Sequence, residues 1–297
     1  MLRCKIASEA ERRLAFASVH PDWPHDPDPA VHLERRLASV QHQRAAWFVG
    51  LDESDQLGVS LGVYPITLFG PGGLRPAGAI GAVYTPAAQR GRGYASELLR
   101  QVMAWSAERG VQDWILFSDI PPSFYERLGF VTVPSYEHHT PASDAAASRW
   151  ALGELPARPC PVDPCAFEWG VHRDPDYRRW LIHKHNAPLR AWYAQRDDGF
   201  GGEGLTALTP EALLILESDL PHHPETWPAV EGLYALLAHR AGLPKAEGWW
   251  TGAAPPPSSG VVPRAEGALM WASARAEDPW RLMVARSGPR LHLSEHI

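Results

Sequence analysis

The chain has 297 residues, and its formal net charge of −6 provides no basic surface of the kind that binds nucleic acid. Hydrophobic residues make up 45% of the chain and charged residues 21%, which is typical of a globular protein and excludes a disordered one. The first residues lack the apolar core of a signal peptide, and no stretch reaches the roughly 18 apolar residues of a membrane span. We therefore expect a cytoplasmic protein of about two domains that binds neither nucleic acid nor a membrane.

The first 135 residues carry the patterns of alternating strands and helices. Ser8 followed by Glu11 is the signature of a capping box, which indicates the start of a helix. Prolines crowd residues 21–29 and predict a loop, because each lacks a donor and restricts the residue before it. In chain order the patterns predict a strand at 2–7, helices at 8–19 and 31–40, strands at 46–51, 59–69 and 77–85, a helix at 94–108, a strand at 114–117, a short helix at 122–127 and a strand at 130–133.

Residues 134–164 are rich in Pro, Ala and Ser and are predicted to be irregular, with His138 and His139 in a solvated loop. We place a domain boundary near residue 150, which gives a first domain at 1–150 and a second at 151–297. The second half is expected to alternate helix and strand again. Its predicted elements are helices at 175–193 and 227–241, strands at 213–216 and near Trp249 and Leu269, and an extended loop at 253–260.

The most informative passage, residues 83–96, is a strand that enters a glycine-containing turn and then a helix. A helix N-terminus presents unpaired N–H groups and the positive end of the dipole, so it binds phosphate groups. Gly91 and Gly93 let the backbone turn these groups toward one point, and Arg90 and Arg92 add positive charge. Ser96 stands where a dinucleotide-binding loop needs glycine, and the Lys-Ser/Thr pair of a P-loop is absent. The alternative interpretation is an ordinary turn.

The pattern Arg90-x-x-Gly93-x-Ala95 after a Val-x-Thr strand resembles the pyrophosphate loop of the GNAT superfamily of acetyl-CoA-dependent N-acetyltransferases. The resemblance covers residues 1–135. It implies a mixed α/β (α+β) fold with a central mixed sheet flanked by helices, and acetyl-CoA as co-substrate. The positions to which it assigns cofactor binding are Val83, Thr85, Arg90, Gly91, Arg92, Gly93, Tyr94, Ala95 and Ser96.

A second match follows at residues 123–130, which resemble the short helix and strand where this superfamily places a Tyr beside the thioester sulfur. The resemblance therefore assigns Tyr125 a catalytic role. A narrower resemblance is to the fungal lysine N6-acetyltransferases, which carry a C-terminal extension, in some cases a degenerate second copy of the fold. A degenerate copy is thus one interpretation of residues 151–297, and an acceptor-pocket domain is another.

The reaction that the resemblance implies is direct transfer, in which a neutral amine attacks the thioester carbonyl. A backbone N–H near Val83 would polarise that carbonyl, and the Tyr125 phenol would protonate the departing thiolate. Asp119 is the candidate base; alternatively, it caps the helix that follows. We expect no metal, because the pairs His183-x-His185 and His222-His223 lack a Cys or carboxylate at metal spacing, and Cys160 and Cys165 alone make a poor zinc site.

We therefore expect an N-acetyltransferase whose partner is a small-molecule or lysine amine acceptor. The alternatives are a non-catalytic acyl-CoA-binding sensor and a scaffold whose second half binds a protein. The loop pattern does not recur after residue 135, so a second CoA site is not expected. Aromatic residues of the second half would either form its core or line an acceptor pocket; they are Trp169, Trp180, Trp192, Tyr193, Trp249, Trp250, Trp271 and Trp280.

Overall fold

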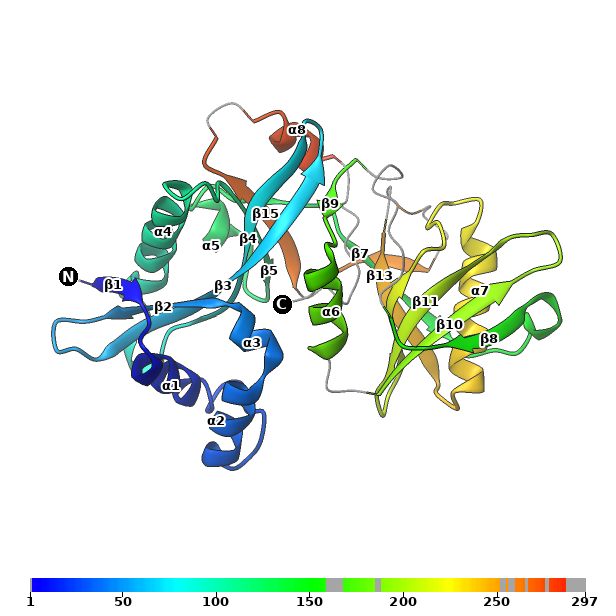
Figure 1. Cartoon of the computed structure of the whole chain (residues 1–297), viewed down its shortest axis with the longest axis horizontal. Helices are drawn as coiled ribbons and strands as arrows, with labels where there is room; N and C mark the ends of the chain where they lie inside the picture. The colour runs from blue at the N-terminus through cyan, green and yellow to red at the C-terminus, as the bar shows by residue number, and fades with distance from the viewer. Residues whose placement is uncertain are drawn as a thin grey trace.

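The computed structural model of the chain describes residues 2–158, 168–184, 188–251, 255, 260–264, 267–275 and 278–286. Two mixed sheets, each flanked by helices, form two lobes that lie side by side (Figure 1). This arrangement confirms the expected mixed α/β class. Within the described parts of the chain, no helix is long and apolar enough to cross a membrane.

The first sheet runs in the order β1-β2-β3-β4-β5-β15-β6, with β9 paired to β3. Strands β4 and β5 are parallel, whereas the other described pairs of this sheet are antiparallel. Its strands are β1 (Arg3–Ile6), β2 (Ala46–Leu51), β3 (Leu57–Gly70), β4 (Gly73–Tyr84), β5 (Asp113–Ser118), β6 (Val131–Thr132), β9 (Gly170–Val171) and β15 (Ala268–Ser273).

The helices of the first half flank this sheet (Figure 1). The capping box at the start of α1 is confirmed: the Ser8 hydroxyl accepts from the Glu11 N–H, and the Glu11 carboxylate accepts from the Ser8 N–H at 2.9 Å. Helix α4 joins β4 to β5 and packs with α5 against one face of the sheet. The elements are α1 (Glu9–Ser18), α2 (Pro29–Ala38), α3 (Val40–Arg44), η1 (Ala87–Gln89), α4 (Tyr94–Ala107) and α5 (Ser123–Glu126).

The second sheet runs in the order β14-β7-β13-β12-β11-β10-β8, and its parallel pair is β12 with β13. Helix α7 joins these two strands and buries its apolar residues against the sheet. The remaining elements are β7 (Tyr136–Pro141), η2 (Ala147–Arg149), β8 (Ala151–Leu155), α6 (Pro175–His183), β10 (Leu189–Gln195), β11 (Gly201–Leu208), β12 (Leu213–Ser218), α7 (Trp227–Arg240), β13 (Lys245–Trp250), β14 (Val261–Pro263) and α8 (Trp280–Val284).

The two sheets share one plan and exchange a strand. Each has a parallel pair joined by a helix of 14 residues, α4 in the first sheet and α7 in the second. In the first sheet, β15 from the C-terminal part of the chain lies between β5 and β6; in the second, β7 from the first half lies between β13 and β14. The sheets therefore do not divide at residue 150, because each is completed by a strand from the other side of that position.

Two expectations about local structure are wrong. Residues 134–164 are not irregular throughout, since they contain β7 and β8. The helix expected over 175–193 ends at His183, and residues 189–195 form β10 between β8 and β11. In both cases pairing with distant strands decides the conformation, which local patterns do not reveal. The loop expected at 253–260 lies mostly outside the described residues.

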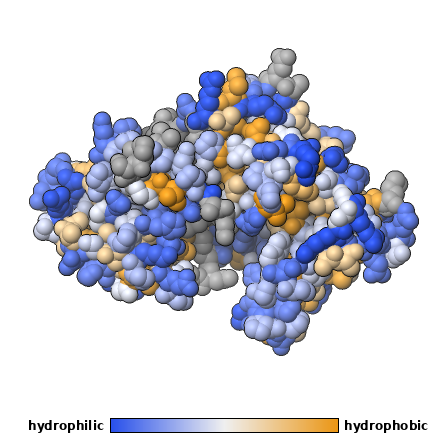
Figure 2. Space-filling view, turned by 180° about the vertical axis from the view of Figure 1, so that it is seen from behind, coloured by the Kyte–Doolittle hydropathy of each residue, from blue (hydrophilic) through white to orange (hydrophobic). Residues whose placement is uncertain are grey.

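The far face of the first sheet, opposite α4, packs against elements of the second half. Its core joins Tyr64 and Ile115 of the sheet to Tyr177 and Trp180 of α6. A buried ion pair joins the segment after β9, which pairs with the first sheet, to β12 of the second sheet, between Arg173 and Glu217 at 3.0 Å. The aromatic residues singled out in the sequence are buried, except Tyr193, which is 45% exposed. On the face shown in Figure 2, apolar surface is broken into patches between hydrophilic residues.

Candidate functional site

The parallel strands β4 and β5 separate near their ends. They pair only where residues 77–80 face residues 113–116, although β4 continues to Tyr84 and β5 to Ser118. The pairing of β4 with β3 shifts register in the same region, and Ala82 there has φ of 50°, which is uncommon for a residue other than glycine. The diverging strand ends leave backbone groups of β4 and β5 without a partner strand between them.

The turn from β4 into α4 follows directly after this opening. Gly91 and Gly93 have φ of 77° and 79°, and Gly93 is the N-cap residue of α4 in the left-handed conformation. No side chain caps this helix, so the N–H groups of its first turn remain available. A Cβ on either glycine would meet no atom within 4 Å, so the backbone conformation, not crowding, is what requires glycine here.

Arg90 is anchored to the rest of the protein. Its Nε donates to the Thr85 carbonyl at 3.0 Å and its Nη2 to Asp22 Oδ2 at 2.6 Å. The Tyr84 hydroxyl donates to the same Asp22 oxygen at 2.8 Å, and this bond is the largest cause that lowers the pKa of Asp22. Asp22 lies in the loop between α1 and α2, so Arg90 holds the turn in place. Sequence reasoning missed Asp22, because nothing local marks it as a partner of Arg90.

The other residues of the predicted loop take different positions. Arg92 is exposed, whereas Val83, Thr85, Ala95 and Ser96 are partly buried. The Tyr94 ring lies over β3, where a Cβ on Gly58 would be 2.8 Å from it. Tyr94 therefore packs against the sheet beneath the turn.

Tyr125 is 6% exposed on α5, with its ring edge-on to Phe124 and to Phe130. Burial raises the pKa of its phenol to about 12, and the charge of Asp119 adds to the effect. Its hydroxyl makes no hydrogen bond to any described residue. Tyr125 is therefore protonated at neutral pH and has its donor available.

Asp119 is exposed and directly follows β5. It does not cap the next helix: the N-cap residue of α5 is Pro122, and no side chain caps this helix. That alternative for Asp119 is therefore wrong. The charge of Asp119 acts on both Tyr125 and Arg264, so Asp119 lies near the other candidate catalytic residue and near a residue of the second half.

Residues of the second half also reach the end of β5 that has separated from β4. The Trp249 ring centroid lies 5.1 Å from that of Phe117, in the part of β5 that pairs with β15 but no longer with β4. Arg264 Cζ lies 3.7 Å from the Trp249 ring centroid and 5.4 Å from that of Phe117. Sequence reasoning considered Trp249 for core or acceptor pocket but missed Arg264. No local signal could have found it, because its partners come from two other strands.

The corresponding place in the second sheet is built differently. Strands β12 and β13 pair over residues 213–215 and 246–248 and then separate, but residues 219–226 contain no glycine. His222 lies there, with Nε2 3.1 Å from the Tyr234 hydroxyl and Nδ1 accepting from the Thr251 N–H at 3.0 Å. Aromatic side chains fill this place instead of a glycine turn.

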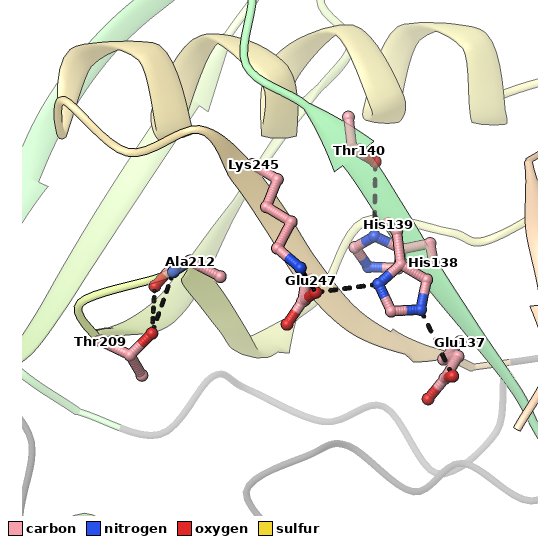
Figure 3. A network of polar contacts seen from close by, with 8 residues as sticks. All are labelled: Glu137, His138, His139, Thr140, Thr209, Ala212, Lys245 and Glu247. Atoms are coloured by element: carbon pink, nitrogen blue, oxygen red, sulfur yellow. Dashed lines mark hydrogen bonds and ion pairs between the residues drawn. The ribbon is translucent and has the colours of Figure 1, made fainter. Parts of the chain in front are cut away.

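His138 belongs to this aromatic cluster, so its expected place in a solvated loop is wrong. It is 1% exposed in β7, and its ring stacks on Tyr234 with centroids 5.1 Å apart. Burial lowers its pKa well below the usual value, so it is neutral. His139, next in the chain, faces outward and contacts Glu137 and Glu247 (Figure 3).

Among the described residues, no group of three His, Cys, Asp or Glu side chains is arranged to hold a metal ion. Cys4 is a free thiol. Cys160, Cys165 and His185 lie outside the described residues.

Residues 7–133 match the family described as acetyltransferase (GNAT) domain. Similar solved structures include a conserved protein of unknown function from Enterococcus faecalis V583, with a TM-score of 0.66 and 16% identity over 91% of this chain and 72% of that one. A GCN5-related N-acetyltransferase from Anabaena variabilis gives 0.64 and 14%, over 91% and 72%. A tandem GNAT protein from the clavulanic acid biosynthesis pathway gives 0.51 and 13%, over 94% and 100%.

At these identities the solved structures show the fold, which the last of them extends to a two-domain GNAT arrangement. The domain match over residues 7–133 supports an acyltransferase. No curated protein matches the chain. None of these comparisons bears on the narrower resemblance to fungal lysine enzymes, which stays a prediction.

Proposed function

We propose that the protein transfers the acetyl group of acetyl-CoA directly to a primary amine, carried by a small molecule or a lysine side chain. The observation that carries this proposal is the separation of β4 from β5 immediately before the glycine turn and the uncapped start of α4. A thioester and a pyrophosphate need neighbouring sites of these two kinds: unpaired strand N–H groups for the first, and a helix N-terminus for the second.

In this proposal the pyrophosphate of acetyl-CoA binds at Gly91 and Gly93, where the first N–H groups of α4 are free. Arg92 adds charge from its exposed side chain, and Arg90 fixes the turn through Asp22. The acetyl carbonyl accepts from a backbone N–H near Val83. That hydrogen bond strengthens as the carbonyl oxygen gains negative charge, which lowers the barrier to attack.

Tyr125 acts on the sulfur. As the amine nitrogen bonds to the carbonyl carbon, the C–S bond breaks and its electron pair moves to sulfur. A phenol with a pKa of about 12 is a weaker acid than a thiol with a pKa near 8.5, so Tyr125 stabilises the thiolate mainly as a hydrogen-bond donor. Asp119 takes the proton that the amine loses, directly or through a water molecule.

The test is a panel of primary amines incubated with acetyl-CoA and the full chain, with free CoA followed by a thiol reagent. Saturable, amine-dependent CoA release is expected. Acetyl-CoA binding is measured in parallel by titration calorimetry. Binding without release for any amine would support the alternative, an acyl-CoA sensor; absence of binding would exclude both.

A glycine variant sharpens this test. Gly93→Val forces a β-branched residue into a left-handed position and should weaken acetyl-CoA binding strongly. Gly199→Val is the matched control, because Gly199 has φ of 84° in the turn between β10 and β11, and a Cβ there meets nothing within 4 Å. Equal acetyl-CoA affinity in the two variants would contradict the pyrophosphate assignment.

A further inference from the structure

Arg264 is a cation without a counterion at the junction of the two sheets. Its guanidinium lies over the Trp249 ring, and its Nε is buried without a hydrogen-bond partner. Among the described residues its side chain has no hydrogen bond or ion pair, although its backbone N–H donates to the Ser135 carbonyl at 3.1 Å. The buried Nε is costly in this state, because this donor has lost water without replacement, and the half-buried guanidinium can still be reached by a ligand.

Two carboxylates act on the charge of Arg264 without contacting it. Burial lowers the pKa of Arg264 to about 10, whereas Glu137 and Asp119 act to raise it, so both carboxylates lie within its electrostatic reach. Neither is close enough for an ion pair. The Glu137 carboxylate instead contacts His139 Nε2 at 3.3 Å, on the outer face of β7 (Figure 3). One guanidinium with two carboxylates nearby is complementary to a molecule that carries both a carboxylate and an ammonium group.

The position of Arg264 relates it to the reaction. Phe117, which its guanidinium also approaches, lies where β5 no longer pairs with β4, two residues before Asp119. The Phe117 side chain packs on the face of the sheet opposite α4 and Tyr125. A molecule held at Arg264 therefore lies beside the opening between β4 and β5, on the side away from the proposed pyrophosphate site.

We propose that Arg264 binds the carboxylate of the acceptor, so that the substrate is an amino acid or a related amino carboxylate; this rests on the proposed acetyl transfer. The planar guanidinium matches a carboxylate in a bidentate fashion, and stacking on Trp249 orients it for that contact. The acceptor amine then lies toward Asp119 and the thioester. A polyamine has no group for Arg264 to bind, and a lysine within a polypeptide has no free carboxylate beside its side chain.

The test uses matched pairs, each an amino acid and its carboxamide, with L-lysine and L-lysine amide as the first pair. Wild-type protein should acetylate the acid at least about tenfold better in kcat/KM, mainly through a lower KM, because the amide lacks the charge that the half-buried guanidinium of Arg264 binds. Arg264→Met keeps a flexible side chain on Trp249 but removes the cation. It should abolish the preference for the acid and leave the KM for acetyl-CoA unchanged.

Two further variants control this experiment. Arg264→Lys keeps the charge without the planar guanidinium and should retain part of the preference for the acid. It also tests the role of Arg264 if Arg264→Met folds poorly. Arg109→Met is the matched control, because Arg109 also stacks on a tryptophan: its Cζ lies 3.9 Å from the ring centroid of Trp105 on α4. Arg109 is exposed and remote from the opening between β4 and β5. This variant should leave the preference intact.

The outcomes separate the two proposals. Equal rates for acid and amide in wild-type protein, or a preference that survives in Arg264→Met, would overturn the role of Arg264 while leaving acetyl transfer in place. If no amine releases CoA, acetyl transfer itself fails, and binding of L-lysine and its amide to the CoA-bound protein then decides on Arg264. Equal affinities for L-lysine and L-lysine amide would overturn the role of Arg264 as well.

Discussion

Asp22 Oδ2 accepts hydrogen bonds from both Arg90 and Tyr84, at 2.6 and 2.8 Å, and so ties the turn after β4 to the loop between α1 and α2. One carboxylate oxygen thus connects two partly exposed segments that are distant in the chain. The turn proposed to bind pyrophosphate is thereby shaped before its ligand arrives. Preorganisation of this kind lowers the cost of binding.

Asp22→Asn should weaken acetyl-CoA binding several-fold with little change in melting temperature. The variant keeps an acceptor for Tyr84 but loses the charge that holds Arg90. Titration calorimetry with acetyl-CoA measures the change. Asp26→Asn is the control, because Asp26 pairs with Arg35 at 3.0 Å in the same loop without touching the turn. Unchanged acetyl-CoA affinity in Asp22→Asn would show that the turn holds its shape unaided.

Tyr125→Phe should lower kcat by about ten- to a hundredfold and leave the KM for acetyl-CoA nearly unchanged, because only the developing thiolate loses a donor. Burial raises the pKa of Tyr125 to about 12, so the phenol stays protonated throughout the working range. The pH profile of wild-type kcat should therefore show no loss attributable to this residue below pH of about 11. Initial rates of CoA release between pH 6 and 10 provide the measurement, and an unaltered kcat in the variant would remove Tyr125 from the mechanism.

Acid should destabilise the protein below pH of about 6.5, partly through buried histidines. Burial lowers the pKa of His42 to about 3 and that of His138 well below its usual value. The folded state thus binds fewer protons than the unfolded state once the pH falls below the pKa of histidine in the unfolded chain, about 6.5. Each histidine contributes stability that is complete above that pH and declines by up to about 1.4 kcal/mol for each unit below it.

Thermal melts between pH 8 and 4.5 measure this decline. His138→Phe keeps a ring on Tyr234 but cannot be protonated, so its melting temperature should fall less steeply below pH 6.5 than that of wild type. His139→Gln, at the exposed neighbouring position, is the control. Parallel curves of melting temperature against pH for wild type and His138→Phe would show that His138 does not contribute to the acid destabilisation.

A fragment of residues 1–150 should not fold on its own. It lacks β15, which pairs with both β5 and β6, and it carries β7, whose partners are β13 and β14. We expect an aggregated or non-cooperatively melting product that does not bind acetyl-CoA, whereas coexpression with residues 151–297 should restore a soluble complex. Gel filtration and circular dichroism measure both, and a monomeric fragment with a cooperative melt would refute the prediction.

Those parts of the fold and site that depend on neighbouring residues could be predicted. The capping box at Ser8 and the turn at Gly91 and Gly93 each arise from local backbone requirements, and the sequence shows them directly. Strand β2 likewise has the expected bounds, because a run of apolar residues ends at a polar turn.

Other parts could not be predicted, since distant segments determine them. The buried positions of β7 are occupied by His138 and Thr140, so the strand has no apolar alternation to recognise. Residues 189–195 become β10 only through pairing with β8 and β11. The contacts of Arg90 with Asp22, and of Arg264 with Trp249, join segments whose proximity exists only in the folded chain.

The exchange of β7 and β15 also sets the order of events during synthesis. Strand β5 gains its partner β15 only after residues 268–273 have been made, about 150 residues after β5 itself has left the ribosome. At about 5 to 20 residues per second, the edge of β5 stays open for roughly 8 to 30 seconds. During that interval β5 and β7 of a nascent chain present unpaired edges to other chains, so we expect the yield of soluble protein to depend on chaperones that shield them.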